Sequence, residues 1–75
     1  MTNQAANPFV DQAGAPYHQG ELIRGALKEG DNFKGTILNK LDAKDEKNPY
    51  KQPALLVDCG EDGYIIFPVR QVNRA

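Results

Sequence analysis

Two short apolar runs separated by a glycine-containing turn constrain this chain more than any other feature. The runs are residues 54–57, Ala-Leu-Leu-Val, and residues 64–67, Tyr-Ile-Ile-Phe. Each has the length of a β-strand and is bounded by turn residues. Gly60 and Gly63 between them can take a positive φ at low cost, and Asp62–Gly63 is a favoured pair for a tight hairpin turn. The pattern therefore predicts a β-hairpin.

The residues before and after this hairpin predict further strands. Residues 33–41 have the β-branched and aromatic content of a strand, and strict alternation places residues 33, 35, 37, 39 and 41 on one face. Residues 22–27 fit either two helical turns or another strand. Pro68 lacks a backbone donor, so strand pairing should change there. We expect a mainly β fold over residues 21–75, a small antiparallel β-meander or partial barrel with at most one short helix.

Residues 42–53, here called the wing, form a long polar loop between two predicted strands. Its mixed charges and two prolines exclude a regular helix through its second half. Tyr50 lies between Lys47 and Lys51. An aromatic ring on such a loop can stack on an unpaired base while the lysines contact phosphates. The alternative is that Tyr50 folds back on the small core.

The N-terminal segment has a different composition from the rest of the chain. Residues 1–20 are rich in Asn, Gln, Ala, Pro and Gly, and their large apolar groups are chiefly Phe9, Val10 and Tyr17. Such a segment cannot bury enough surface to form its own core. We expect residues 1–20 to be a flexible arm, disordered alone or laid across another surface, and a route by which a protein partner could bind.

The small size of the chain predicts self-association. In a protein of 75 residues, burial of apolar surface barely offsets the entropy lost on folding. Cys59 is the single cysteine, so no internal disulfide can form, and no Cys/His cluster is available for zinc. Four consecutive apolar residues in a strand indicate that both faces are covered. We expect a homodimer or larger assembly without a cofactor.

The charge pattern gives a weaker signal. Nine Lys and Arg residues against ten Asp and Glu residues give a formal net charge of −1, so no overall field attracts nucleic acid. Residues 33–57 nevertheless hold five lysines against three acids. No run approaches the roughly 20 apolar residues that span a bilayer, and the N-terminus lacks the layout of a signal peptide. We expect a cytoplasmic protein without a membrane partner.

The residues needed for catalysis are missing from the sequence. The chain has no serine to serve as a nucleophile, and its single histidine, His18, lies in the expected arm. Cys59 is close to Asp58, Glu61 and Asp62, and acidic neighbours raise the pKa of a thiol and so disfavour a reactive thiolate. We do not expect an enzyme.

Short motifs resemble two groups of OB-fold proteins. Residues 27–37, Leu-Lys-Glu-Gly-Asp-Asn-Phe-Lys-Gly-Thr-Ile, resemble the opening of an S1-type RNA-binding domain, and residues 60–65 resemble its second hairpin. Residues 47–50, Lys-Asn-Pro-Tyr, followed by residues 55–60 and Tyr64, are similar to the small single-stranded-DNA-binding proteins of filamentous phages. This resemblance implies an OB-like dimer in which a tyrosine and basic residues of the wing contact DNA.

Together these patterns predict a non-catalytic module that binds single-stranded DNA or RNA by base stacking and lysine–phosphate contacts. The alternative is a small protein-interaction module, either a regulator or inhibitor of a partner protein or an assembly subunit. Arg74 is a further candidate for a phosphate contact. The predicted nucleic-acid-binding residues are Lys34, Lys40, Lys44, Lys47, Tyr50, Lys51, Tyr64 and Arg70.

Overall fold

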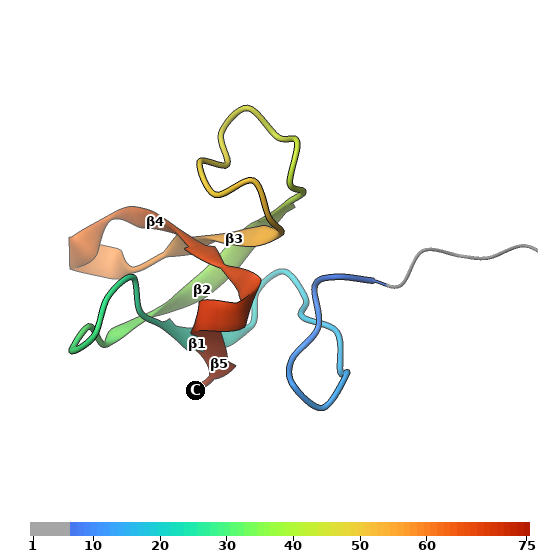
Figure 1. The fold of residues 1–75 in the computed structure, drawn as a ribbon. Helices are drawn as coiled ribbons and strands as arrows, with labels where there is room; N and C mark the ends of the chain where they lie inside the picture. Colours follow the sequence, from blue (N-terminus) through green and yellow to red (C-terminus); the bar gives the residue numbers. More distant parts are fainter. Residues whose placement is uncertain (1–6) are drawn as a thin grey trace, which may run out of the picture.

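The computed structural model describes residues 7–75, which form one five-stranded antiparallel sheet (Figure 1). Its order is β4-β3-β2-β1-β5, so four strands form a meander and the last returns beside the first. This confirms the mainly β fold, and residues 22–25 form a strand and not a helix. The elements are β1 (Leu22–Gly25), β2 (Phe33–Leu41), β3 (Ala54–Asp58), the 3₁₀ turn η1 (Gly60–Asp62), β4 (Tyr64–Pro68), the 3₁₀ turn η2 (Val69–Gln71) and β5 (Val72–Arg74).

The connection through η2 shows that the sheet is strongly curled. β4 and β5 are the two edge strands, yet only the three residues of η2 join them. A flat sheet would separate these edges by about 19 Å, whereas the 3₁₀ geometry of η2 advances roughly 2 Å per residue. The two edges must therefore approach each other, which gives the sheet the form of a partial barrel. β4 ends at Pro68, so pairing changes there as predicted. Val69 N–H still donates to the Pro53 carbonyl, which places the Pro68 nitrogen on the open edge, where its missing donor removes no bond to β3.

The turn between β3 and β4 is longer than the predicted two-residue turn. Cys59 N–H donates to the carbonyl of Gly63 at 2.9 Å, and η1 lies between these two residues. Gly60 and Gly63 have φ values of 63° and 80°, so both need the conformational freedom of glycine. The predicted positive φ at Gly60 and Gly63 is confirmed, but the turn is not an isolated Asp62–Gly63 pair.

A β-bulge in β2 changes which residues share a face. Ile37 lies opposite Val57, but Asn39 lies opposite Leu56, so the register shifts between residues 37 and 39. A bulge inserts one extra residue and reverses the alternation beyond it. The prediction that residues 39 and 41 share the face of residues 33, 35 and 37 is therefore wrong. Strict alternation also predicts that Lys40 shares a face with Lys34, and the shifted register, with Lys40 opposite Leu55, shows that it does not.

The core lies on the concave face of the curled sheet and draws on every strand. Phe67 is fully buried, and its ring centroid lies 6.0 Å from that of Phe33. Gly25 leaves room for this ring, because a Cβ on Gly25 would lie 2.8 Å from it. Gly35 similarly lies against the backbone of Asp58. The buried core residues are Tyr17, Ile23, Ile37, Leu55, Val57, Cys59, Phe67 and Val72.

Tyr17 corrects the predicted boundary between arm and domain at residue 20. Its side chain is 1% exposed within the core, and its hydroxyl donates to the carbonyl of Val72 at 3.1 Å. Phe9 packs partly against the same cluster. Apolar groups in a polar segment can join a core that other residues build, which composition alone does not reveal. The first six residues of the predicted arm lie outside the described residues.

Arg74 ties the segment before β1 to the end of the sheet. Its guanidinium carbon lies 4.6 Å from the centre of the Tyr17 ring, a cation–π contact. It also pairs with the carboxylates of Asp11 and Glu21 and donates to the carbonyls of Ala15 and Pro16. The Ala15 backbone N–H and then the Arg74 guanidinium lower the pKa of Asp11. Arg74 is thus engaged within the chain.

Candidate binding surfaces

The wing is a structured loop built around Asn48. This residue is 6% exposed, and its side-chain amide donates to the carbonyls of Asp42 and Gln52 at 2.9 and 2.7 Å. In Figure 1 the wing projects from the ends of β2 and β3. Leu41 and Ala54 at its base are buried but do not belong to the main core. Ala54 is therefore buried within a single copy of the chain, and the homodimer stays a prediction.

Tyr50 is anchored to the edge strand β4. Its hydroxyl donates to the carbonyl of Ile66 at 2.8 Å, and the residue is half-buried. Along an antiparallel pair of strands, hydrogen-bonded residue pairs alternate with non-hydrogen-bonded ones. The bonds from Cys59 N–H to the Gly63 carbonyl and from Val69 N–H to the Pro53 carbonyl make the Leu56–Ile66 pair a non-hydrogen-bonded one. In such a pair the backbone groups point away from the partner strand, so the Ile66 carbonyl faces the open edge of β4. Tyr50 thus folds back onto the edge of the sheet and not onto the main core, and the residue is partly exposed.

Tyr64 is the most exposed large hydrophobic residue among residues 7–75. Its side chain is 73% exposed and lies on the face of the sheet opposite the core, here called the outer face. Register places Leu22, Thr36, Asp58 and Tyr64 in one row across this face. Two residues along a strand span about 7 Å, so Tyr64 lies about that far along β4 from the residue that anchors Tyr50.

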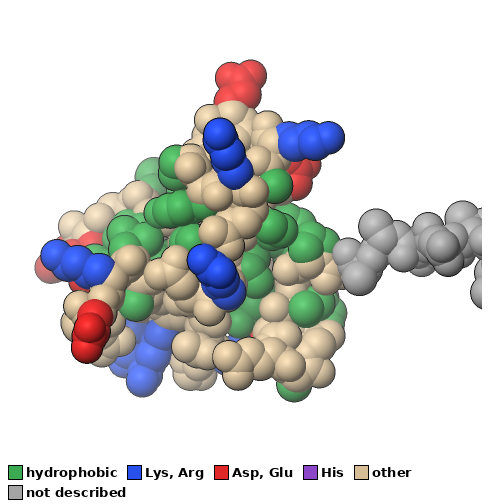
Figure 2. All heavy atoms as spheres, in the orientation of Figure 1, with side chains coloured by type: hydrophobic (Ala, Val, Ile, Leu, Met, Phe, Trp, Pro, Cys, Tyr) green, Lys and Arg blue, Asp and Glu red, His purple; other side chains and the backbone are tan. Residues whose placement is uncertain are grey.

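The structure divides the predicted cationic residues into separate groups. All are exposed. Figure 2 shows both blue and red side chains on the projecting wing, which carries the first group, Lys44, Lys47 and Lys51, together with acids. Lys34 lies on the outer face, and Lys40 lies beyond the bulge. Arg70 lies on η2 and lines a groove.

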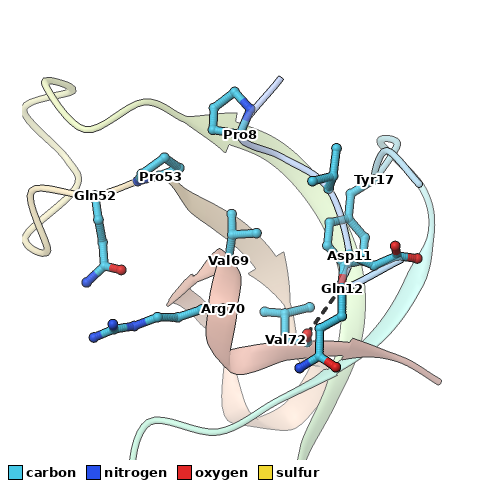
Figure 3. Close-up of a pocket in the computed structure, with 10 residues that line it drawn as sticks. Pro8, Asp11, Gln12, Tyr17, Gln52, Pro53, Val69, Arg70 and Val72 are labelled. Carbon is cyan, nitrogen blue, oxygen red and sulfur yellow. Dashed lines mark hydrogen bonds between the residues drawn. The ribbon is translucent and has the colours of Figure 1, made fainter. Parts of the chain in front are cut away.

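This groove lies between the N-terminal segment and η2 (Figure 3). Its volume is about 310 Å³. The Tyr17–Val72 hydrogen bond lies along it, with Arg70 and Gln52 on one side of the view and Gln12 on the other. Its apolar lining comes from Pro8, Val10, Tyr17, Pro53, Val69 and Val72. Phe9 and Tyr17, the groups predicted to meet a protein partner, contact this chain's own core, and a partner at the N-terminal segment stays a prediction.

Acidic groups surround one end of the Tyr64 row. Asp58 lies opposite Tyr64, and Glu61 and Asp62 are exposed on η1 directly before it. Burial raises the pKa of the Cys59 thiol, and the nearby carboxylates of Asp62 and Asp58 raise it further. The predicted direction is confirmed, although the main cause is burial and not the acidic neighbours. An anionic ligand would be repelled at this end of the row.

The described residues provide no obvious metal centre. Within residues 7–75, no three His, Cys, Asp or Glu side chains are grouped as metal ligands would be. No helix in this part of the chain has the length and apolar character needed to cross a membrane. Comparison with models of known protein families, with characterised proteins and with solved structures gave no match.

Sequence reasoning missed several residues that shape these surfaces. Arg24 lies on the outer face of β1, directly opposite Lys34. The sequence around it favours a strand almost as much as a helix, and only the strand brings the two cations together. Asn48 was read as part of a polar loop, although Asn beside Pro is a common turn signal. The signal for Tyr17 was weaker, because nothing local indicates that its ring enters a distant core.

Proposed function

We propose that this protein is a non-catalytic module that binds single-stranded nucleic acid on the outer face of β4 and the adjoining wing. The observation that carries the proposal is the position of Tyr64, 73% exposed on the edge strand to which Tyr50 is anchored. The two tyrosines thus meet at one strand, Tyr64 as its first residue and Tyr50 through the hydrogen bond from its hydroxyl to Ile66. Extended single strands with unstacked bases are the ligand class that such aromatic pairs suit.

Base stacking would supply most of the affinity. Each base stacked on an aromatic side chain contributes about 1–3 kcal/mol. The hydroxyl bond to Ile66 restrains the Tyr50 ring, so less side-chain entropy is lost when a base binds. Tyr64 offers an open ring face. Stacking depends little on base identity, so the expected binding has low sequence preference.

The distribution of charge determines on which side of the two tyrosines the phosphates of a bound strand lie. Glu61 and Asp62 repel phosphates near the start of β4, whereas Lys47 and Lys51 lie on the wing beside Tyr50. We therefore place the phosphates on the wing side. Because the formal net charge of the chain is −1, single-site affinity should be modest. Two or more copies along one strand would strengthen it, consistent with the predicted oligomer.

Fluorescence anisotropy with labelled oligo-dT and oligo-U tests the proposal. Tyr64→Leu should weaken binding about tenfold, since one stacked base is lost, and Tyr64→Phe should bind as the original chain does. Lys51→Gln should weaken binding and reduce its dependence on salt. Lys28→Gln, an exposed lysine on the β1–β2 loop, is the matched control. Absence of binding at low salt, or equal binding by Tyr64→Leu and Tyr64→Phe, would reject the proposal.

A further inference from the structure

A row of polar side chains crosses the other end of the outer face. Asn73 of β5 lies opposite Arg24 of β1, and Arg24 lies opposite Lys34 of β2. The bond between Ile37 N–H and the Glu21 carbonyl fixes the phase of the β1–β2 ladder. It makes Arg24 and Lys34 a non-hydrogen-bonded pair, the kind in which opposite Cα atoms are only about 4.5 Å apart. The side chains of Arg24 and Lys34 therefore leave neighbouring Cα atoms on the same face of the sheet.

This arrangement is unfavourable without an anion. Like charges directly opposite each other in a sheet destabilise it. The ion pairs of residues 7–75 are those of Arg74, and neither Arg24 nor Lys34 has a carboxylate within ion-pair distance. Two carboxylates lie nearby; each accepts hydrogen bonds from the backbone and keeps its negative charge, but neither pairs with Arg24 or Lys34. Asp58 accepts from Gly60 N–H, and Asp31 accepts from the N–H groups of residues 27 and 28.

A hollow beside the row offers space for a ligand. Its volume is about 280 Å³, and its polar lining comes from Arg24, Asp31, Asn32, Gln71, Asn73 and Arg74. A guanidinium presents a planar fork of donors, and amide groups add further N–H donors. Lys34 does not line the hollow, but it lies opposite Arg24 on the neighbouring strand and adds a second positive charge beside it. The set has the two charges and several donors that a tetrahedral oxyanion requires.

We propose that Arg24, Lys34 and Asn73 form a binding site for the phosphate oxygens of a ligand. The site shares the outer face with Tyr64 but contains none of the aromatic residues of the proposed function. Phosphate oxygens could come from the backbone of a nucleic acid or from a small phosphorylated compound. The inference therefore stands whether or not oligonucleotides bind at Tyr64.

Titration with inorganic phosphate tests the site directly. Backbone amide signals of residues 24, 34 and 73 in a heteronuclear NMR spectrum should shift to saturation with phosphate, relative to sodium chloride of equal ionic strength. Arg24→Gln and Lys34→Gln should each weaken phosphate binding about tenfold, since each loses a charged hydrogen bond. The exposed cation variant Lys28→Gln is the matched control. No saturable shift, or equal affinity in Arg24→Gln and Lys28→Gln, would overturn the proposal.

A second experiment, with oligo-dT, identifies the source of the phosphate and separates the two proposals. If Arg24→Gln also weakens binding of oligo-dT, the site holds the nucleic-acid backbone. If it affects inorganic phosphate alone, the ligand is a small phosphorylated compound. Tyr64→Leu should bind inorganic phosphate as the original chain does. Phosphate binding without oligonucleotide binding would support this site and reject the proposed function, and the opposite result would do the reverse.

Discussion

The hydroxyl of Tyr17 donates to the carbonyl of Val72, and these two residues lie 55 positions apart in the chain. The bonds from Ala26 N–H to the Gln71 carbonyl and from Ala75 N–H to the Leu22 carbonyl fix the phase of the β1–β5 ladder. In that phase the Val72 carbonyl points away from β1, towards the open edge. Tyr17 therefore caps β5 as Tyr50 caps β4. Both edges of the sheet end at a tyrosine hydroxyl, which limits pairing with other strands.

We expect Tyr17→Phe to lower the free energy of unfolding by about 1–2 kcal/mol, because a buried carbonyl loses its donor. Tyr17→Ala should lower it by about 3–5 kcal/mol, since a large cavity is left in the core. Urea unfolding followed by circular dichroism measures both. Tyr64→Phe, which alters an exposed hydroxyl, is the control and should stay within about 0.5 kcal/mol. A Tyr17→Phe variant as stable as this control would mean that the cap is not needed.

The fold could be predicted because local signals and burial agreed in the central strands. The predicted strand over residues 33–41 coincides with β2, and both apolar runs form strands of the predicted hairpin. The bulge after Ile37 could not be predicted, because alternation over a short strand cannot reveal an extra residue. The place of β5 beside β1 was also missed. It depends on the curl of the whole sheet and not on any local pattern.

The candidate site was less predictable than the fold. Tyr64 and Tyr50 were both selected from sequence, but their common position along β4 depends on the wing folding back around Asn48. The opposition of Arg24 and Lys34 depends on strand register. Such relationships between distant residues arise from tertiary packing, so sequence reasoning finds the chemical groups and not their arrangement.

Replacing either of two glycines in the sheet by alanine should lower the stability of the fold, and the two losses should differ in size. At Gly25 an added Cβ would lie 2.8 Å from the Phe67 ring, which can shift only within a filled core. We expect Gly25→Ala to cost about 1–3 kcal/mol of stability. Gly35→Ala should cost more, because its Cβ would collide with the backbone carbonyl of Asp58, which the β2–β3 ladder holds in place. The ranking can be read from urea midpoints. A Gly35→Ala variant more stable than Gly25→Ala would contradict this packing.

Asp11 should make stability depend on pH in acid. Its pKa lies below the ordinary value of 3.8, because Ala15 N–H and Arg74 stabilise the carboxylate. A group with a lowered folded pKa adds stability above its unfolded pKa and loses it as the pH falls through the folded value. The thermal midpoint of the original chain should exceed that of Asp11→Asn near neutral pH. The difference should shrink below about pH 4. Equal midpoints throughout would show that Asp11 adds nothing.

Tyr50→Phe separates the anchoring of the wing from base stacking. The variant keeps the aromatic ring but removes the donor to Ile66, so we expect a loss of about 1 kcal/mol in unfolding free energy. Oligonucleotide binding should weaken only slightly, since the ring face remains, whereas Tyr50→Ala should weaken it about tenfold.

Light scattering at increasing concentration adds a second measurement to this pair of variants. The unmasked Ile66 carbonyl gives the β4 edge an extra acceptor, so Tyr50→Phe should associate more readily than the original chain. Lys51→Gln, which leaves the hydroxyl in place, is the control. If Tyr50→Phe and Tyr50→Ala lose oligonucleotide binding equally, the hydroxyl and not the ring makes the contact, and Tyr50 is not a stacking residue.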